Sequence, residues 1–139
     1  MAGRVVLIDT GPLVASLSRR DHHTWAVEEM SRLRRPLVTG EAVLSEAGFL
    51  LSSVGLDPAL PLDAVARGAL IVQPVVAEVS ERIASLMRTY ANLPMSLADA
   101  ALVGLAEATP EAAVFTTDSD FHVYRKRGSE TIPLLFPPT

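Results

Sequence analysis

Short aliphatic segments alternate with helical patterns along nearly the whole chain, and this alternation constrains the fold more than any other feature. Segments typical of strands cover residues 4–8, 37–38, 70–73, 113–116 and 132–135. Helical patterns occupy residues 13–18, 23–33, 41–54, 61–69, 77–91 and 96–108. Strands that are separated by helices pair in parallel, so the pattern predicts an α/β fold with a mainly parallel sheet and helices on both faces.

The length and composition predict one domain over residues 1–139, because 139 residues suffice for a self-sufficient core. The hydrophobic fraction of 49% and the mean hydropathy of +0.31 favour strands buried on both faces or a sizeable partner interface. No apolar run approaches the roughly 20 residues of a membrane span, and the N-terminus does not resemble a secretory signal. We therefore expect a cytoplasmic protein without a membrane partner.

The chain contains no cysteine, so any metal must be held by oxygen or imidazole, which favours hard cations. The formal charge of −4 argues against a nucleic-acid partner. That objection weakens if four of the 16 acidic residues bind metal, since 16 − 4 = 12 equals the number of basic residues.

Acidic residues follow two of the predicted strands. Asp9 comes directly after the first strand, and Asp118 and Asp120 follow the fourth. In parallel α/β sheets the ligand crevice lies beyond the carboxyl ends of the strands. We therefore expect these three carboxylates at the crevice.

Two further acids interrupt apolar helix faces. Glu46 lies beside the apolar stripe of its helix, and Asp99 shares a helix side with Leu102 and Val103. A buried carboxylate without a partner is unfavourable. The charges of Glu46 and Asp99 therefore require a compensating partner.

Most of these acids also have an ordinary structural interpretation. Ser96 and Asp99 form a capping-box pattern, Asp9 could occupy a turn or cap a helix, and Asp118 could cap the segment that follows it. Glu46 has the weakest such interpretation, because no basic residue lies three or four positions away.

Taken together, the acids favour a metal site. Two carboxylates at ~4 Å repel each other by about 4 kcal/mol at an effective dielectric near 20, and a divalent cation removes that repulsion. Carboxylate oxygens suit Mg²⁺ or Mn²⁺. The chemistry that follows is metal-assisted hydrolysis of a phosphodiester.

Four segments carry a resemblance to a known family. They are "VVLIDTGPLVA", the helix with Glu46, "YANLPMSLADAALVGLAE" and "VFTTDSDFHVYR". In order and spacing they resemble the PIN-domain ribonucleases, and most of all the VapC-type toxins of bacterial toxin–antitoxin pairs. The resemblance runs from about Arg4 to Leu135.

The resemblance implies a three-layer α/β/α sandwich, often dimeric, that binds Mg²⁺ or Mn²⁺, cleaves RNA and is paired with a cognate antitoxin protein. By matching position it also implies a metal-binding quartet, which consists of Asp9, Glu46, Asp99 and Asp118. It further implies that Asp120 is an additional acid, that Thr117 is a supporting hydroxyl and that Arg125 contacts a phosphate. Asn92 stands where relatives often carry a carboxylate ("YADLP"), which puts a second metal in doubt.

Two other functions compete with the ribonuclease. A haloacid-dehalogenase-like phosphatase also begins with an Asp after a strand, but it requires an acid two residues later, where this chain has Gly11. A PIN fold without catalysis could act as an RNA-binding or protein-interaction module, with Asn92 as its main support. The apolar segment "GFLLSSVGL" is consistent with a groove for an antitoxin.

Overall fold

The computed structural model describes residues 4–138 and contains a five-stranded sheet in which all neighbours run parallel. The sheet order is β3-β2-β1-β4-β7. The strands are β1 (Val6–Ile8), β2 (Leu37–Thr39), β3 (Leu70–Val72), β4 (Ala113–Phe115) and β7 (Leu134–Leu135). The predicted parallel sheet is confirmed. Four of its strands are shorter than their predicted ranges, and β2 extends one residue farther than predicted, to Thr39.

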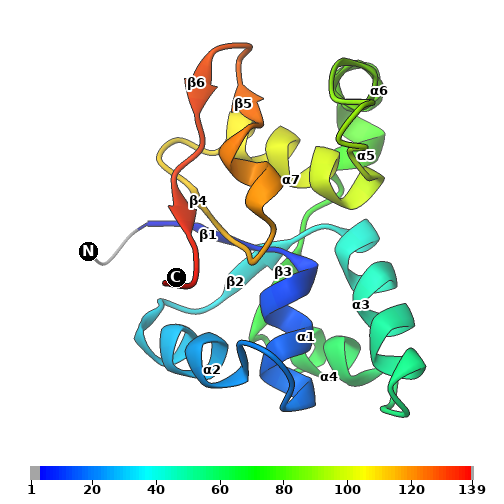
Figure 1. Cartoon of the computed structure of the whole chain (residues 1–139), viewed down its shortest axis with the longest axis vertical. Helices are drawn as coiled ribbons and strands as arrows, with labels where there is room; N and C mark the ends of the chain where they lie inside the picture. Colours follow the sequence, from blue (N-terminus) through cyan, green and yellow to red (C-terminus); the bar gives the residue numbers. More distant parts are fainter. Residues whose placement is uncertain (1–3, 139) are drawn as a thin grey trace.

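Helices cover both faces of this sheet (Figure 1). On one face lie α1 (Thr10–Ser18), α2 (His23–Arg32) and α4 (Leu60–Ala66). On the other lie α5 (Val75–Glu78), α6 (Ser80–Thr89) and α7 (Leu97–Ala108). Helix α3 (Glu41–Ser53) packs against both α1 and α7. The three-layer α/β/α sandwich is confirmed.

The core explains the high apolar content. The central strands β1 and β4 are buried along their whole length. Helix α7 buries every residue from Ala98 to Ala106, as expected of a helix that is apolar on all sides. The expectation of strands buried on both faces is therefore confirmed for the centre of the sheet.

The single helix predicted for residues 77–91 is wrong, because α5 and α6 are separate helices. Val79 joins them with φ −130° and ψ 43°, outside the helical region. Val75 and Ile83 flank this break, and both lie against Gly104 of α7, where a Cβ would crowd their side chains. Packing on α7 overrides a helical pattern that is continuous in the sequence.

The C-terminal third contains small elements that the sequence pattern did not predict. A 3-10 helix, η1 (Ser119–His122), follows β4. Strands β5 (Arg125–Lys126) and β6 (Glu130–Thr131) then form an antiparallel hairpin. Each is too short to carry a periodic signal. Within residues 4–138, no helix is both long and apolar enough to span a membrane.

Candidate functional site at the carboxyl edge of the sheet

Asp9 lies between β1 and α1 and is only 4% exposed. Its Oδ1 accepts a hydrogen bond from the Thr10 N–H over 2.8 Å, and its Oδ2 accepts one from the Thr116 hydroxyl over 2.7 Å. The helix starts at Thr10, three residues before the predicted start, so that Asp9 is its N-cap. The capping role considered for Asp9 is therefore confirmed. Together the two hydrogen bonds hold both carboxylate oxygens in place.

Thr116 connects Asp9 to Asp118. The buried Thr116 hydroxyl donates to Asp9 and accepts from the backbone N–H of Asp118 over 2.9 Å. The supporting hydroxyl predicted from the sequence was the neighbouring Thr117, and Thr116 was missed. A signal was present, since a threonine hydroxyl two residues before Asp118 can bond its backbone in a local turn.

Thr117 lies against Gly11 of α1. A Cβ at Gly11 would collide with the Thr117 hydroxyl. An acid at position 11, which a haloacid-dehalogenase-like phosphatase would need, does not fit this packing.

Asp99 lies in the first turn of α7 and is 8% exposed. Its backbone N–H donates to the Ser96 hydroxyl over 3.1 Å, so the Ser96 half of the predicted capping box forms. Its carboxylate is bound differently, because Oδ2 accepts a hydrogen bond from the Tyr124 hydroxyl over 2.9 Å. Tyr124 is fully buried and was not predicted from the sequence as a site residue.

Asp118, Asp120 and Glu46 are half-buried. Asp118 caps η1, with its Oδ1 accepting from the Asp120 N–H over 2.9 Å, which confirms a capping role. Within residues 4–138 the ion pairs join Arg32 to Glu29, Arg82 to Glu107 and Arg127 to Glu130. None of them neutralises the five predicted site acids.

The pKa values show that the acids act on one another. The pKa of Asp9 is raised to about 7, mainly by burial; the charges of Asp99 and Asp118 contribute to the rise, and the Thr116 and Thr10 hydrogen bonds oppose it. Burial also raises the pKa of Asp99, and the charges of Asp118 and Glu46 add to this against the hydrogen bond from Tyr124. The fold thus brings Asp9, Glu46, Asp99 and Asp118 within electrostatic reach of each other.

Asp120 belongs to the same region, since its charge helps to raise the pKa of Tyr124, which burial raises most. Across residues 4–138, no three histidine or acidic side chains already stand in a geometry that could hold a metal ion. The region is therefore a concentration of negative charge without a basic partner, and its chemistry is that of a site that attracts cations.

Arg125 and Asn92 lie apart from these hydrogen bonds. Arg125 Nη1 donates to the backbone carbonyls of His122, Val123 and Tyr124 over 2.7, 3.1 and 3.1 Å. Asn92 is exposed in the turn after α6. Arg125 therefore braces the segment after η1 with one of its nitrogens.

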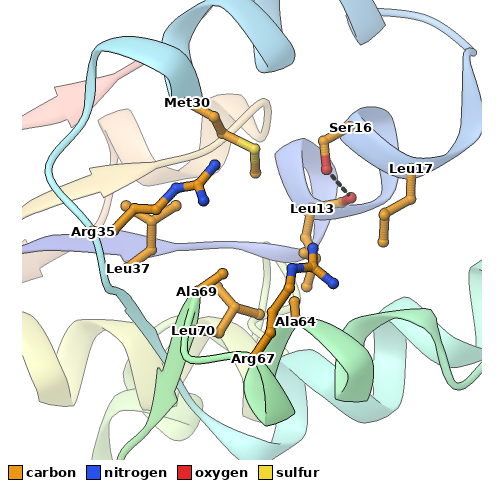
Figure 2. A pocket seen from close by; sticks show the side chains of 10 residues that line it. All are labelled: Leu13, Ser16, Leu17, Met30, Arg35, Leu37, Ala64, Arg67, Ala69 and Leu70. Carbon is orange, nitrogen blue, oxygen red and sulfur yellow. Dashed lines mark hydrogen bonds between the residues drawn. The ribbon is translucent and has the colours of Figure 1, made fainter.

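One hollow lies close to the site and another lies away from it. A groove of about 500 Å³ runs between α1 and α3 and is lined by Gly11 and Leu50, so one end of it is close to Asp9. Figure 2 shows a smaller, mainly apolar cavity of about 80 Å³, with Arg35 and Arg67 among its lining residues. This cavity is lined by Leu37 and Leu70, the first residues of β2 and β3, at the opposite edge of the sheet from the acids.

The family model of the PIN domain matches residues 6–127. The chain belongs to the PIN domain family. This match confirms the resemblance seen in the sequence and includes all the predicted site residues.

The fold is also similar to a crystal structure of the Mycobacterium tuberculosis toxin VapC20, which cleaves the sarcin–ricin loop. The TM-score is 0.75 at 19% sequence identity, over 85% of this chain and 93% of that chain. No curated protein matches this sequence. The PIN domain of this chain therefore has the fold of a VapC toxin.

Proposed function

We propose that this PIN domain is a metal-dependent endoribonuclease and the toxin of a type II toxin–antitoxin pair. The observation that carries the proposal is the pair of buried carboxylates, Asp9 and Asp99, whose pKa values are raised by burial and by the charge of Asp118. They follow β1 and begin α7 at the sheet edge where parallel α/β proteins bind ligands. Membership of the PIN family and the likeness to VapC20 support the same activity.

The donor set fits a hard divalent cation, because it consists of carboxylates with no basic neighbour among the described ion pairs. Asp9, Glu46, Asp99 and Asp118 would hold Mg²⁺ or Mn²⁺. When bound, the ion would lower the pKa of a water and stabilise the leaving oxygen of the phosphodiester. Asp120 would orient the water or assist a second ion, and Asn92 would tune the adjoining turn.

The protein's own groups prepare this chemistry. Burial of Asp9 and Asp99 keeps water from screening their charge, which strengthens every electrostatic interaction made there. Thr116 and Tyr124 hold one oxygen of each carboxylate, so neither side chain is free to rotate away. Arg125 would contact a phosphate with the nitrogens that the backbone does not use.

Cleavage of end-labelled total RNA by the purified chain tests this function. We expect discrete cuts with Mn²⁺, none with EDTA and none with Asp99→Asn. Asp63→Asn is the matched control, because Asp63 is an exposed acid on α4, on the other side of the sheet from α7. Intact RNA in every lane, from folded protein that binds Mn²⁺, would instead favour a non-catalytic PIN module, for which Asn92 is the sequence argument.

The proposal includes a cognate antitoxin. The groove between α1 and α3 leads toward Asp9 and is lined by the exposed side chain of Leu50 (39%); the next residue back on α3, Phe49, is 72% exposed. An amphipathic helix or extended peptide would cover these side chains, and an arginine from it could reach the acids. Inhibition of cleavage by the product of the neighbouring reading frame, relieved by Leu50→Asp, is the expected result.

We further propose a homodimer in the cytoplasm. Exposed apolar side chains outside the groove, among them Leu62 and Ile71, are consistent with a subunit interface. Light scattering on the eluting protein gives the mass, and a monomer at micromolar concentration would count against the dimer.

A further inference from the structure

We propose that the hollow between η1, the β5–β6 hairpin and β7 binds an unpaired nucleobase of the RNA substrate. This inference rests on the proposed ribonuclease function and deepens it. The hollow has a volume of about 290 Å³ and is lined mainly by Phe121, His122, Arg125, Thr131, Leu134 and Phe136.

The hollow adjoins the acids through the chain itself. Asp118 caps η1, and Phe121 and His122 form the end of that same short helix. On the other wall, Phe136 directly follows β7, whose Leu135 pairs with Phe115 of β4 and accepts a hydrogen bond from the Thr116 N–H over 3.1 Å. Phe136 therefore leaves the sheet at the carboxyl edge, beside the segment that carries Asp118.

Two aromatic rings form a corner in this hollow. The rings of His122 and Phe136 meet edge to face, with centroids 4.7 Å apart and planes at 75°. Because the rings are not stacked on each other, a flat base can stack on one ring while the other closes the side. Stacking of unpaired bases on aromatic side chains is the usual basis of single-strand RNA recognition.

Arg125 supplies fixed hydrogen-bond donors to the same hollow. Three backbone carbonyls hold its Nη1, whereas Nε and Nη2 make no hydrogen bond within residues 4–138. A planar guanidinium held in this way suits the acceptor edge of a base or the phosphate next to it.

The charge of the hollow points to RNA as well. No acidic side chain is among its lining residues, although the acids of the candidate site lie one short helix away. A site for phosphate alone would not need two aromatic rings. The combination of aromatic, cationic and hydroxyl groups matches a nucleotide.

The experiment measures binding of fluorescein-labelled single-stranded RNA octamers of each base, in EDTA, by fluorescence anisotropy. A second probe is a chain of the same length without bases. We expect Phe136→Ala to weaken binding of at least one RNA octamer by roughly 5- to 150-fold, the range of one base–aromatic stack. The base-free chain should bind weakly and equally to both proteins.

His122→Ala is the second variant, because His122 is exposed and its loss does not threaten the core. Val27→Ala is the control, an exposed apolar truncation on α2, on the far side of the sheet, which should bind like the wild type. Equal affinities of wild type and Phe136→Ala, or equal losses on the base-free chain, would overturn the inference. So would the failure of the wild type to bind any octamer.

Binding in EDTA separates the two proposals. Base-dependent binding without any cleavage in Mn²⁺ would support the base site and reject the ribonuclease. Metal-dependent cleavage with affinities that Phe136→Ala does not change would reject the base site alone.

Discussion

The hydroxyl of Tyr124 donates a hydrogen bond to Asp99 Oδ2 over 2.9 Å, between residues that lie 25 positions apart. Tyr124 is fully buried, and burial together with the nearby acids raises its pKa well above the ordinary value. The phenol therefore stays protonated and remains a donor. Asp99, one of the two most buried acids of the candidate site, is thus held by Tyr124, which lies outside α7, the helix that carries Asp99.

Loss of this hydroxyl should weaken metal binding. In Tyr124→Phe the hydrogen bond that lowers the pKa of Asp99 is gone, so the carboxylate binds protons more readily and cations less. A hydrogen bond to a charged group contributes about 1.5–3 kcal/mol, which corresponds to roughly 10- to 150-fold in Mn²⁺ affinity by calorimetry. Tyr90→Phe is the control, since the Tyr90 hydroxyl accepts from the Arg125 N–H and is not bonded to an acid. Equal Mn²⁺ affinities of the two variants would contradict the role of Tyr124.

Thr116→Val should destabilise the protein by about 1–3 kcal/mol, because it leaves Asp9 Oδ2 and the Asp118 N–H without their shared partner. Urea denaturation in EDTA measures the loss. Thr117→Val provides the comparison and tests the accessory role predicted for Thr117 from the sequence. A larger loss of RNA cleavage in Thr117→Val than in Thr116→Val would reverse our assignment of the supporting hydroxyl.

Metal-free protein should lose stability as pH rises. The pKa of Asp9 is raised from 3.8 to about 7 in the folded state, so the folded state binds this proton more tightly than the unfolded state does. The contribution of Asp9 to the free energy of unfolding is therefore complete below about pH 4 and is lost as pH rises through about 7. The total loss is up to about 4 kcal/mol, at 1.36 kcal/mol per pKa unit.

Free energies of unfolding at several pH values in EDTA should show this slope in the wild type and a flatter profile in Asp9→Asn. Mn²⁺ should restore stability above pH 7, because a ligand that binds only the folded state stabilises it. Parallel profiles for wild type and Asp9→Asn would show that Asp9 does not titrate in this range.

Glu107 should anchor the hairpin that lines the proposed base site. Its carboxylate accepts from Arg82 Nε over 3.0 Å and Nη2 over 2.7 Å, and from the Arg127 N–H over 2.7 Å. The Arg82 hydrogen bonds lower the pKa of Glu107, so this stabilisation is present at neutral pH and is lost as pH falls through the folded-state pKa.

We expect Glu107→Gln to reduce the free energy of unfolding by about 1 kcal/mol. The expected loss is small because Arg82 is partly exposed, so solvent screens its interaction with Glu107. Glu130→Gln, in the more exposed pair with Arg127, should change it by less than about 0.5 kcal/mol. Equal destabilisation by the two substitutions would contradict the anchoring role of Glu107.

The sequence predicted the elements whose signals are local or periodic. Asp9 and Asp118 could be placed at one sheet edge because each follows a strand of a parallel sheet. Thr116 was missed because its role depends on the neighbouring strand, and Tyr124 because its partner, Asp99, lies on the distant helix α7. The break at Val79 was missed because the residues around it pack against Gly104, which lies 25 residues farther along the chain.

The central position of β1 affects the order in which the site can form during synthesis. Asp9 leaves the ribosome long before the hydroxyl that holds it, on Thr116, which follows 107 residues later. Strand β4, which pairs with β1, likewise emerges long after β1. A nascent chain interrupted before this point lacks Asp118 and the hydroxyls of Thr116 and Tyr124, so we expect incomplete translation products to be inert toward the RNA of the cell that makes them.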